Sequence, residues 1–244
     1  MGTPAFSLPT LYKLHESEHK VQLVVTQPDR PKGRGRESTP PPVKQFALEK
    51  KIPILQPKKC TSPDIVKSLD KLNTDVFVVV AFGQILDKNL LELPSHFCIN
   101  LHSSLLPKYR GAAPINWALI NGETETGITT MKMDIGLDTG DILLSDKVPI
   151  NCEDDAQSLH DTLALKGSNL VLETLNQLDC GSLKAVPQNA DQASYAPKLK
   201  KEDGLIEWNQ PAIKIHNLVR GLTPWPGAFS FLESKRFKIC KTEI

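Results

Sequence analysis

The stretch CINLHSSLLPKYR, residues 98–110, is the part of the sequence that decides the fold. It begins with apolar residues that predict a strand, and this strand carries two polar side chains, Asn100 and His102. Residues at positions i and i+2 of a strand point to the same face. A Ser-Ser-Leu-Leu-Pro turn follows, so the pair lies where a strand ends. Open α/β sheets carry their chemistry at that position.

Strand and helix patterns alternate around this stretch through about residue 180. The strongest signal is DVFVVVA, residues 75–81, because an unbroken apolar run is typical of a parallel strand covered on both faces. Residues 21–26 predict a second strand, and residues 154–178 predict a long helix. The pattern predicts an α/β, Rossmann-like catalytic domain with a mainly parallel sheet over residues 1–184.

The last sixty residues predict a linker and the beginning of another domain. Residues 185–204 contain prolines and little apolar periodicity, which is typical of a linker. We then expect a short strand at residues 206–208, a helix at residues 211–220 ended by Gly221, and a hairpin. A helix and a hairpin are too small to bury a core alone. Residues 205–244 therefore predict only part of a second domain.

The composition indicates a soluble intracellular protein. The net charge is +1, so affinity for a polyanion must come from a local patch. The five cysteines are scattered and odd in number, which favours reduced thiols over disulfides or a zinc site. No apolar run approaches the roughly 20 residues of a membrane span, and no signal peptide is evident at the N-terminus.

A basic, proline- and glycine-rich segment covers residues 27–43 and predicts a long loop. Positive charges recur at every second position, at Arg30, Lys32, Arg34 and Arg36. A solvated surface loop is the simple interpretation of such a run. Guanidinium groups on a glycine-containing backbone also suit phosphate oxygens, which favours contact with nucleic acid.

The polar residues near the strand end suit acyl transfer to an amine. The Asn100 amide can donate a hydrogen bond to a developing oxyanion. His102 can carry protons, and a carboxylate beside it would hold its tautomer. The glycine-rich loop at residues 134–141 offers Asp134, Asp138 and Asp141 for that role, and spacing alone leaves the choice open. Asn-x-His is in itself a weak signal, since a histidine at a strand end is often only structural.

Two other chemistries find little support in the sequence. Ser103 and Ser104 follow the histidine, but the sequence lacks the GxSxG elbow of serine hydrolases. Histidines and acids show no metal-ligand spacing, so we expect no metal. Phe82, Gly83 and Gln84 end the strand at residues 75–81, either as a plain βα turn or as a backbone wall against a flat ligand.

The motifs together resemble a known enzyme family. NLHSSLLP at residues 100–107, RGAAP at residues 110–114 and DIGLDTG at residues 134–140 are similar to those of the formyltransferases that use 10-formyltetrahydrofolate. The segments GTP at residues 2–4 and QPDRPKGRG at residues 27–35 narrow the resemblance to the methionyl-tRNA formyltransferases. YAPK at residues 195–198 and PWPG at residues 224–227 support the same branch.

This resemblance implies a catalytic trio of Asn100, His102 and Asp138. It implies formyl transfer from 10-formyltetrahydrofolate to the α-amino group of methionine on initiator tRNA, for translation initiation. We expect a monomer in the bacterial cytoplasm, with an organellar version of the family as the alternative. The implied binding residues are Ser104, Leu105, Leu106, Pro107, Phe82, Gly83 and Gln84 for folate, and Arg34 and Arg36 for tRNA.

The sequence also departs from the family pattern. Members have a first strand of the type KIVFMGTP and a C-terminal OB-like barrel, whereas this sequence begins at the Met of that motif and contains only the start of the barrel. We therefore expect a chain truncated at both ends, with its first strand missing from the centre of the sheet. Alternatives are formyl transfer to a small nucleotide or sugar-nucleotide amine, and a non-catalytic RNA-binding fragment.

Overall fold

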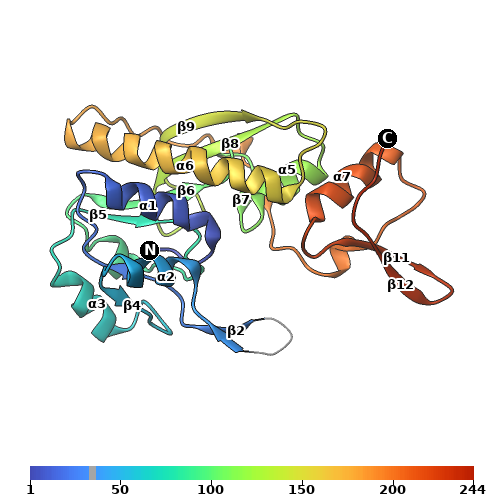
Figure 1. Ribbon diagram of the computed structural model, residues 1–244. Helices are drawn as coiled ribbons and strands as arrows, with labels where there is room; N and C mark the ends of the chain where they lie inside the picture. Colours follow the sequence, from blue (N-terminus) through green and yellow to red (C-terminus); the bar gives the residue numbers. More distant parts are fainter. Residues whose placement is uncertain (33–36) are drawn as a thin grey trace. The chain divides into compact units, whose positions relative to one another are not determined.

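A computed structural model describes residues 1–32 and 37–244 (Figure 1). The chain forms two compact units, and each is described by itself. Three elements, the strands β8 and β9 and the helix α6, contribute residues to both. Unit 1 consists of residues 1–102, 129–144 and 164–187, and unit 2 consists of residues 103–128, 145–163 and 188–244.

The main sheet has four strands in the order β5-β6-β8-β9. The pair β5–β6 is parallel, and β6 pairs with β8 in the antiparallel direction. The apolar run that predicted a buried strand forms β5, and the stretch carrying Asn100 and His102 forms β6. The predicted mainly parallel α/β fold is confirmed, with β8 as an antiparallel neighbour of β6. The strands are β5 (Val76–Val79), β6 (Phe97–His102), β8 (Glu125–Lys132) and β9 (Ile142–Pro149).

A second parallel pair joins β1 (Val24–Val25) to β4 (Ile54–Leu55). Met1 and Gly2 lie between this pair and β5. The Gly2 amide donates to the Val25 carbonyl at 3.0 Å, and the Val80 amide donates to the Met1 carbonyl at 2.9 Å. The Met1 amine donates to the Val78 carbonyl at 2.6 Å, and burial lowers the pKa of this amine to about 6. Met1 and Gly2 therefore connect the β1–β4 pair to the main sheet.

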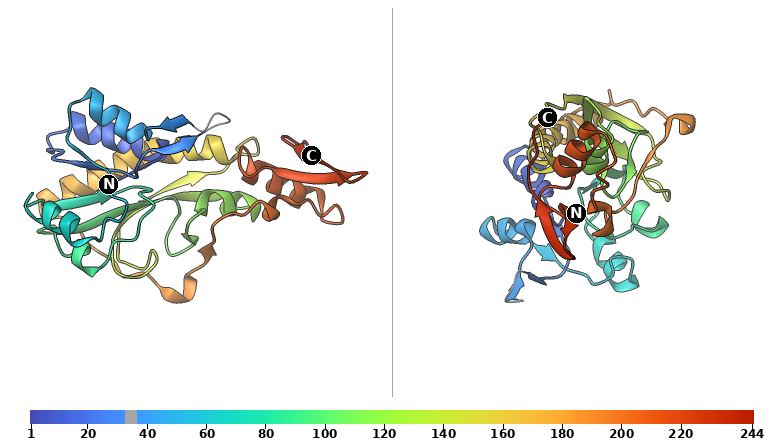
Figure 2. Two further views of the ribbon diagram at one scale, coloured as in Figure 1. Left: turned by 90° about the horizontal axis from the view of Figure 1, so that it is seen from below. Right: turned by 90° about the vertical axis from the view of Figure 1, so that its right-hand side faces the viewer.

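The helix α1 (Leu8–Glu16) runs beside the C-terminal part of α6 (Ala156–Asp179), as Figures 1 and 2 show. Lys13 donates a hydrogen bond to Asn169, and the His19 ring lies 3.1 Å from the Asn176 amide oxygen. The remaining helices of unit 1 are α2 (Pro42–Glu49), α3 (Pro63–Asp70) and α4 (Lys88–Leu91).

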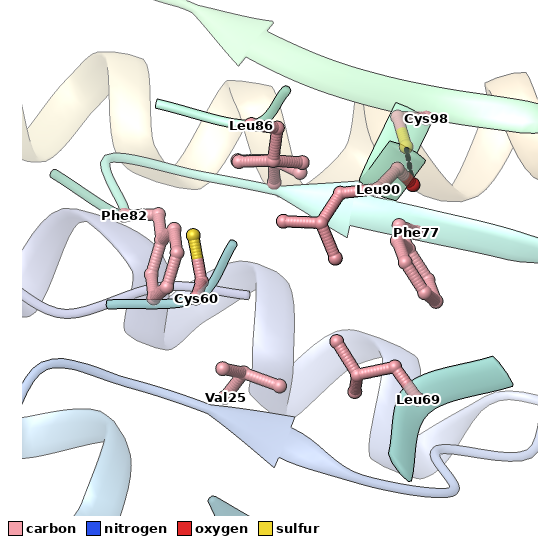
Figure 3. Close-up of a cluster of buried hydrophobic side chains, with 9 residues drawn as sticks. Val25, Cys60, Leu69, Phe77, Phe82, Leu86, Leu90 and Cys98 are labelled. Carbon is pink, nitrogen blue, oxygen red and sulfur yellow. Dashed lines mark hydrogen bonds between the residues drawn. The ribbon is translucent and has the colours of Figure 1, made fainter. Parts of the chain in front are cut away.

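One hydrophobic cluster packs around β5 and β6 (Figure 3). Phe77 and Cys98 belong to these two strands, while Val25 comes from β1 and Leu69 from α3. The Cys98 thiol lies 3.9 Å from the Leu90 carbonyl, and burial raises its pKa to about 12. The apolar character of these residues thus fixes the strand that carries the polar pair.

The basic segment is more regular than a plain loop. Its described residues form two short antiparallel strands, β2 (Arg30–Lys32) and β3 (Glu37–Thr39). Prolines and glycines concealed the ladder from sequence analysis, because both residue types disfavour strands. Arg34 and Arg36, the predicted tRNA contacts, lie outside the described residues.

In unit 2 the helix α7 (Ala212–Leu222) packs against α5 (Pro114–Ile120). Our prediction that this helix stops before Gly221 was wrong, since it continues to Leu222. A Cβ at Gly221 would collide with the Ile120 side chain, so the glycine permits close packing of the helices rather than ending one.

The C-terminal hairpin consists of β11 (Ala228–Leu232) and β12 (Lys235–Ile239). The strand predicted at residues 206–208 was also wrong, because only an isolated bridge from Leu205 to Phe229 forms there. Within the predicted linker, β10 (Tyr195–Ala196) pairs in parallel with β7 (Arg110–Gly111). The linker is therefore attached to unit 2 by backbone hydrogen bonds.

Candidate active site

The candidate site lies at the end of β6, a strand with a paired neighbour on each side. Asn100 is in register with Val79 of β5 and with Met131 of β8, and His102 is in register with Thr129. Asn100 and His102 are two residues apart, so their side chains share one face of the sheet. His102 is buried and Asn100 is half-buried. The backbone is therefore held on both sides at Asn100 and by β8 at His102.

The loop between β8 and β9, residues 134–141, holds its own shape. The Asp134 carboxylate accepts hydrogen bonds from the Gly136 amide at 3.0 Å and from the Thr139 hydroxyl at 2.8 Å. The Lys132 amide donates to the Asp141 carbonyl at 2.9 Å and closes the loop. A Cβ at Gly140 would collide with the Lys132 carbonyl oxygen, which explains why a glycine stands there.

Asp138 is the loop carboxylate that reaches the histidine. Its Oδ2 lies 3.7 Å from the His102 Nδ1, and its side chain is only 16% exposed. The residue adopts a left-handed backbone with φ +53°, a conformation uncommon outside glycine. Geometry thus brings Asp138 to His102, whereas Asp134 bonds within its own loop. Sequence spacing did not distinguish these two acids.

The arrangement has a defined chemical capability. Asp138 lies on the Nδ1 side of the imidazole, so Nε2 is on the other side of the ring. A carboxylate in this position orients a histidine and stabilises its protonated form. An amide donor and an oriented imidazole on one face of a strand end can stabilise negative charge on a carbonyl oxygen.

The turn after β5 belongs to the same unit. Its three predicted ligand-binding residues differ in what they leave available to a ligand. Phe82 is buried in the cluster of Figure 3, so only its backbone is available to a ligand. Both polar ends of the Gln84 amide bond within the protein, to the Cys60 amide at 2.7 Å and the Pro57 carbonyl at 3.0 Å. Gly83 is exposed, with φ +81°. Its backbone is the open part of this turn.

Sequence analysis missed the side chains that hold this turn. The Phe82 carbonyl accepts hydrogen bonds from the Thr3 hydroxyl at 2.9 Å and from the Gln27 amide at 3.3 Å. Arg30 in turn donates to the Gln27 side chain at 3.0 Å. In the sequence, the one sign of this role is the position of Gln27, which directly follows an apolar strand.

The Ser-Leu-Leu-Pro segment belongs to unit 2. The buried Ser104 hydroxyl donates to the Lys108 carbonyl at 2.6 Å, which closes a tight turn. Leu106 is buried, while Leu105 and Pro107 are half-buried. Leu105 fits against Gly127, where a Cβ would collide with its side chain. These contacts give the segment a fixed shape within its own unit.

Nowhere in residues 1–32 and 37–244 do three or more histidines, cysteines or acids gather as metal ligands would. None of the helices in the same ranges combines the length and the apolar character needed to cross a bilayer.

Comparison with protein families gives two matches. The family described as formyl transferase matches residues 1–175, and the formyl transferase C-terminal domain matches residues 198–244. Two methionyl-tRNA formyltransferases are similar over all 244 residues. The protein from Geobacter metallireducens is 58% identical, with 78% of its length covered, and that from Geobacter sulfurreducens is 55% identical, with 77% covered.

Solved structures share the fold at much lower identity. A sugar 3N-formyl transferase with dTDP and 5-N-formyl-THF has a TM-score of 0.72 and 22% identity, covering 98% of this chain and 83% of that one. The N-formyltransferase from Helicobacter canadensis, with folinic acid and dTDP-3-aminofucose, gives 0.72 and 21%, covering 98% and 84%.

Proposed function

The chain belongs to the formyl transferase family, and we propose that it transfers a formyl group from 10-formyltetrahydrofolate to methionyl initiator tRNA for translation initiation. The observation that carries this proposal is the similarity of all 244 residues to methionyl-tRNA formyltransferases. The pairing of His102 with Asp138 at the end of β6 supports an active enzyme rather than a non-catalytic relative.

The exposed residues near the site fit a folate co-substrate. Ile135 and Leu137 on the loop, and Ile85 on the turn, are 82%, 63% and 87% exposed, although all three are apolar. A flat heterocycle would cover such side chains, and the open backbone of Gly83 offers polar groups to its edge. When bound, 10-formyltetrahydrofolate supplies the formyl carbonyl.

Each member of the trio has a role in our proposal. The Asn100 amide donates a hydrogen bond to the formyl oxygen, which gains negative charge as the methionine amine attacks. Such a donor commonly contributes about 2.7–4 kcal/mol. His102 stabilises the same charge, while Asp138 holds its ring and assists removal of the amine proton. No protein nucleophile is needed, because the substrate amine forms the new C–N bond itself. The bond between the formyl carbon and the folate nitrogen then breaks, and tetrahydrofolate leaves with a proton that replaces the one lost by the amine.

We assign the folate-binding role to two segments. Ser104, Leu105, Leu106 and Pro107 would border the folate, and the turn of Phe82, Gly83 and Gln84 would face its pterin. Because the Phe82 and Gln84 side chains are committed within the protein, their contribution would come from the backbone. Gly83 is the residue of this turn at which a ligand could approach most closely.

The tRNA would contact the basic segment, residues 27–43, and the C-terminal residues 205–244. Arg34 and Arg36 are the proposed phosphate or base contacts, because guanidinium groups suit phosphate oxygens. We divide the chain into a catalytic domain at residues 1–184, a linker at 185–204 and a tRNA-binding part at 205–244. We further propose a cytoplasmic monomer, with initiator methionyl-tRNA and the folate as its partners.

A second candidate function is formyl transfer to a sugar-nucleotide amine. It is favoured by the structural neighbours, several of which are named as sugar formyltransferases. Those neighbours share the fold at low identity, whereas the full-length relatives above 50% identity carry the tRNA-specific name. We therefore place tRNA formylation first.

One assay separates the candidates. The 244-residue chain would receive 10-formyltetrahydrofolate with charged initiator tRNA, or with a dTDP-amino sugar, and release of tetrahydrofolate would be followed by absorbance. We expect turnover with the tRNA and none with the amino sugar. The reverse result would assign the sugar-nucleotide function. Formyl transfer to neither acceptor, with retained tRNA binding, would indicate the non-catalytic alternative.

The tRNA contact needs its own variant. Arg34→Ala should raise KM for initiator tRNA while the affinity for the folate stays unchanged. Lys88→Ala is the matched control, because this lysine lies on α4 outside both proposed tRNA-binding regions, is exposed, and makes only a long contact with Glu92, at 3.7 Å. Equal tRNA kinetics for Arg34→Ala and the parent would remove Arg34 from the proposed interface.

A further inference from the structure

Residues 188–196 of the predicted linker, which we call the strap, lie beside residues 107–113 within unit 2. The Arg110 amide donates to the Ser194 carbonyl at 2.8 Å, and the amides two and three residues further on donate to the Ala196 carbonyl at 2.9 and 3.2 Å. These contacts extend beyond the short pair of β7 and β10. The strap is therefore ordered against the residues that directly follow the Ser-Leu-Leu-Pro segment.

Ser194 contacts this stretch through three different groups. Its hydroxyl accepts a hydrogen bond from the Tyr109 amide at 2.9 Å. Its carbonyl accepts from the Arg110 amide, and its own amide donates to the Pro107 carbonyl at 3.4 Å. Pro107 is the last residue of the segment to which we assign folate binding. Ser194 therefore holds the end of that segment from outside its own turn.

Tyr109 has a backbone conformation that requires such contacts. Its φ is +59°, in the left-handed region that residues with a Cβ seldom adopt. A conformation of this kind persists only where the surrounding structure enforces it. Tyr109 is buried, so its amide needs an acceptor from the protein, and Ser194 supplies one. The Tyr109 hydroxyl donates to Glu123 at 2.7 Å, which fixes the other end of the side chain.

Gln188 holds the next residue through its side chain. Arg110 is only 5% exposed, and its Nε and Nη2 both donate to the Gln188 amide oxygen, at 3.0 and 2.7 Å. Burying a charged group is costly unless it is hydrogen-bonded, so this acceptor stabilises the buried position of the guanidinium. Arg110 is thus held by the strap at its side chain through Gln188 and at its backbone through Ser194.

We propose that Ser194 and Gln188 are positioning residues for the folate co-substrate. By holding Tyr109 and Arg110, they keep residues 104–107 in the shape that borders the folate. They act through these two neighbours rather than on the reacting atoms. The proposal rests on the proposed formyl transfer, because it uses the folate-binding role of residues 104–107. It predicts that the strap affects folate binding and leaves the chemical step unchanged.

Steady-state kinetics of Ser194→Ala, with 10-formyltetrahydrofolate and charged initiator tRNA, test the first residue. The change removes the acceptor that the buried Tyr109 amide uses, so KM for the folate should rise roughly 5–20-fold. Both kcat and KM for the tRNA should stay within about twofold of the parent. Ser194→Thr keeps a hydroxyl and should restore the parent values. Gln192→Ala, at an exposed residue of the strap, is the matched control and should change none of the three.

A second pair of variants tests Gln188 and is independent of the first. Gln188→Ala removes the acceptor of the Arg110 guanidinium and should also raise KM for the folate. Gln188→Glu keeps an acceptor oxygen at this position and should retain the parent KM. If Ser194→Ala does not fold, the Gln188 pair still decides. A parent-like KM for the folate in the alanine variants would overturn the proposal. Equal losses in an alanine variant and its conservative partner would overturn it as well.

Binding of 5-formyltetrahydrofolate without tRNA, measured by titration calorimetry, separates this proposal from the proposed function. If the parent chain binds this analogue but does not formylate tRNA, and Ser194→Ala weakens the binding, the positioning role holds and the tRNA function fails. If the parent formylates tRNA and Ser194→Ala binds the analogue equally well, the positioning role fails and the function holds. A parent chain that binds no analogue would contradict both.

Discussion

Two strands of unit 1 have similar apolar composition but different surroundings. β6 pairs with β5 from Phe97 to Asn100 and with β8 from Ile99 to His102, and it carries the polar pair of the candidate site. β1 pairs with β4 on one side, and on the other side its Val25 carbonyl accepts a hydrogen bond from the Gly2 amide. The comparison separates two requirements: the site depends on β6 being held in place, while the packing of unit 1 also depends on how Met1 and Gly2 join β1 to β5.

The largest expected effect breaks the chemistry at β6 without disturbing its ladder. His102→Ala should lower kcat for formyl transfer by roughly 10²–10⁴-fold, because it removes the group that stabilises charge and handles protons. The measurement is initial-rate kinetics with charged initiator tRNA. The melting temperature should remain within a few degrees of the parent. A rate within threefold of the parent would remove His102 from the mechanism.

The second prediction distinguishes two carboxylates of one loop. Asp138→Asn should reduce kcat on the order of 10²-fold, since the amide cannot stabilise a protonated histidine. Asp134→Asn is the matched control, because Asp134 bonds to Gly136 and Thr139 instead of the histidine. We expect it to act on the shape of the loop and to cost less activity. Equal losses in the two variants would contradict separate roles.

The third prediction concerns the buried Met1 amine and the pH dependence of stability. Burial lowers the pKa of the Met1 amine to about 6, whereas an unfolded amine titrates near 8. Between these values the unfolded chain binds more protons, so the free energy of unfolding should rise with pH. The gain should be about 2–3 kcal/mol from below pH 6 to above pH 8.

Urea unfolding at a series of pH values measures this gain. A chain acetylated at Met1 is the control, since it has no amine to titrate and should lose the rise across this window. Superimposable pH profiles for the free and the acetylated chain would show that the amine does not carry the effect.

The smallest expected effect tests a buried hydroxyl on α1. Thr10→Val keeps the shape of the side chain and removes a buried hydroxyl that has no hydrogen-bond partner among the described residues. We expect stabilisation by about 1 kcal/mol, in the range typical for an unsatisfied polar group. Ser7→Ala is the contrasting change, because the Ser7 hydroxyl donates to the Val80 carbonyl at 2.6 Å. Its removal should lower the free energy of unfolding. Destabilisation by Thr10→Val would indicate that its hydroxyl is satisfied.

Much of the fold followed from local patterns. An apolar run without polar interruption predicted β5, and the polar pair on the next strand predicted where chemistry would lie. Errors occurred where distant residues decide the outcome. The helix α7 continues through Gly221 because α5 approaches there, and no local pattern around the glycine contains that information.

The same limit applied to the candidate site. Residue types predicted an amide, an imidazole and a carboxylate, and resemblance alone selected Asp138 among the acids of the loop. The physical reason for the difference between Asp134 and Asp138 is the set of hydrogen bonds inside the loop, which becomes visible only in three dimensions. Thr3 and Gln27 were missed for a similar reason, since they act on a backbone carbonyl far along the chain.

The buried thiol of Cys98 has a practical consequence for spectroscopy. With its pKa raised to about 12, it stays protonated at neutral pH and is a poor target for maleimide reagents. Cys152 and Cys240 are exposed and belong to unit 2, while the exposed Cys180 belongs to unit 1. Fluorophores can therefore be attached to either unit while the strand that carries Asn100 and His102 remains chemically untouched.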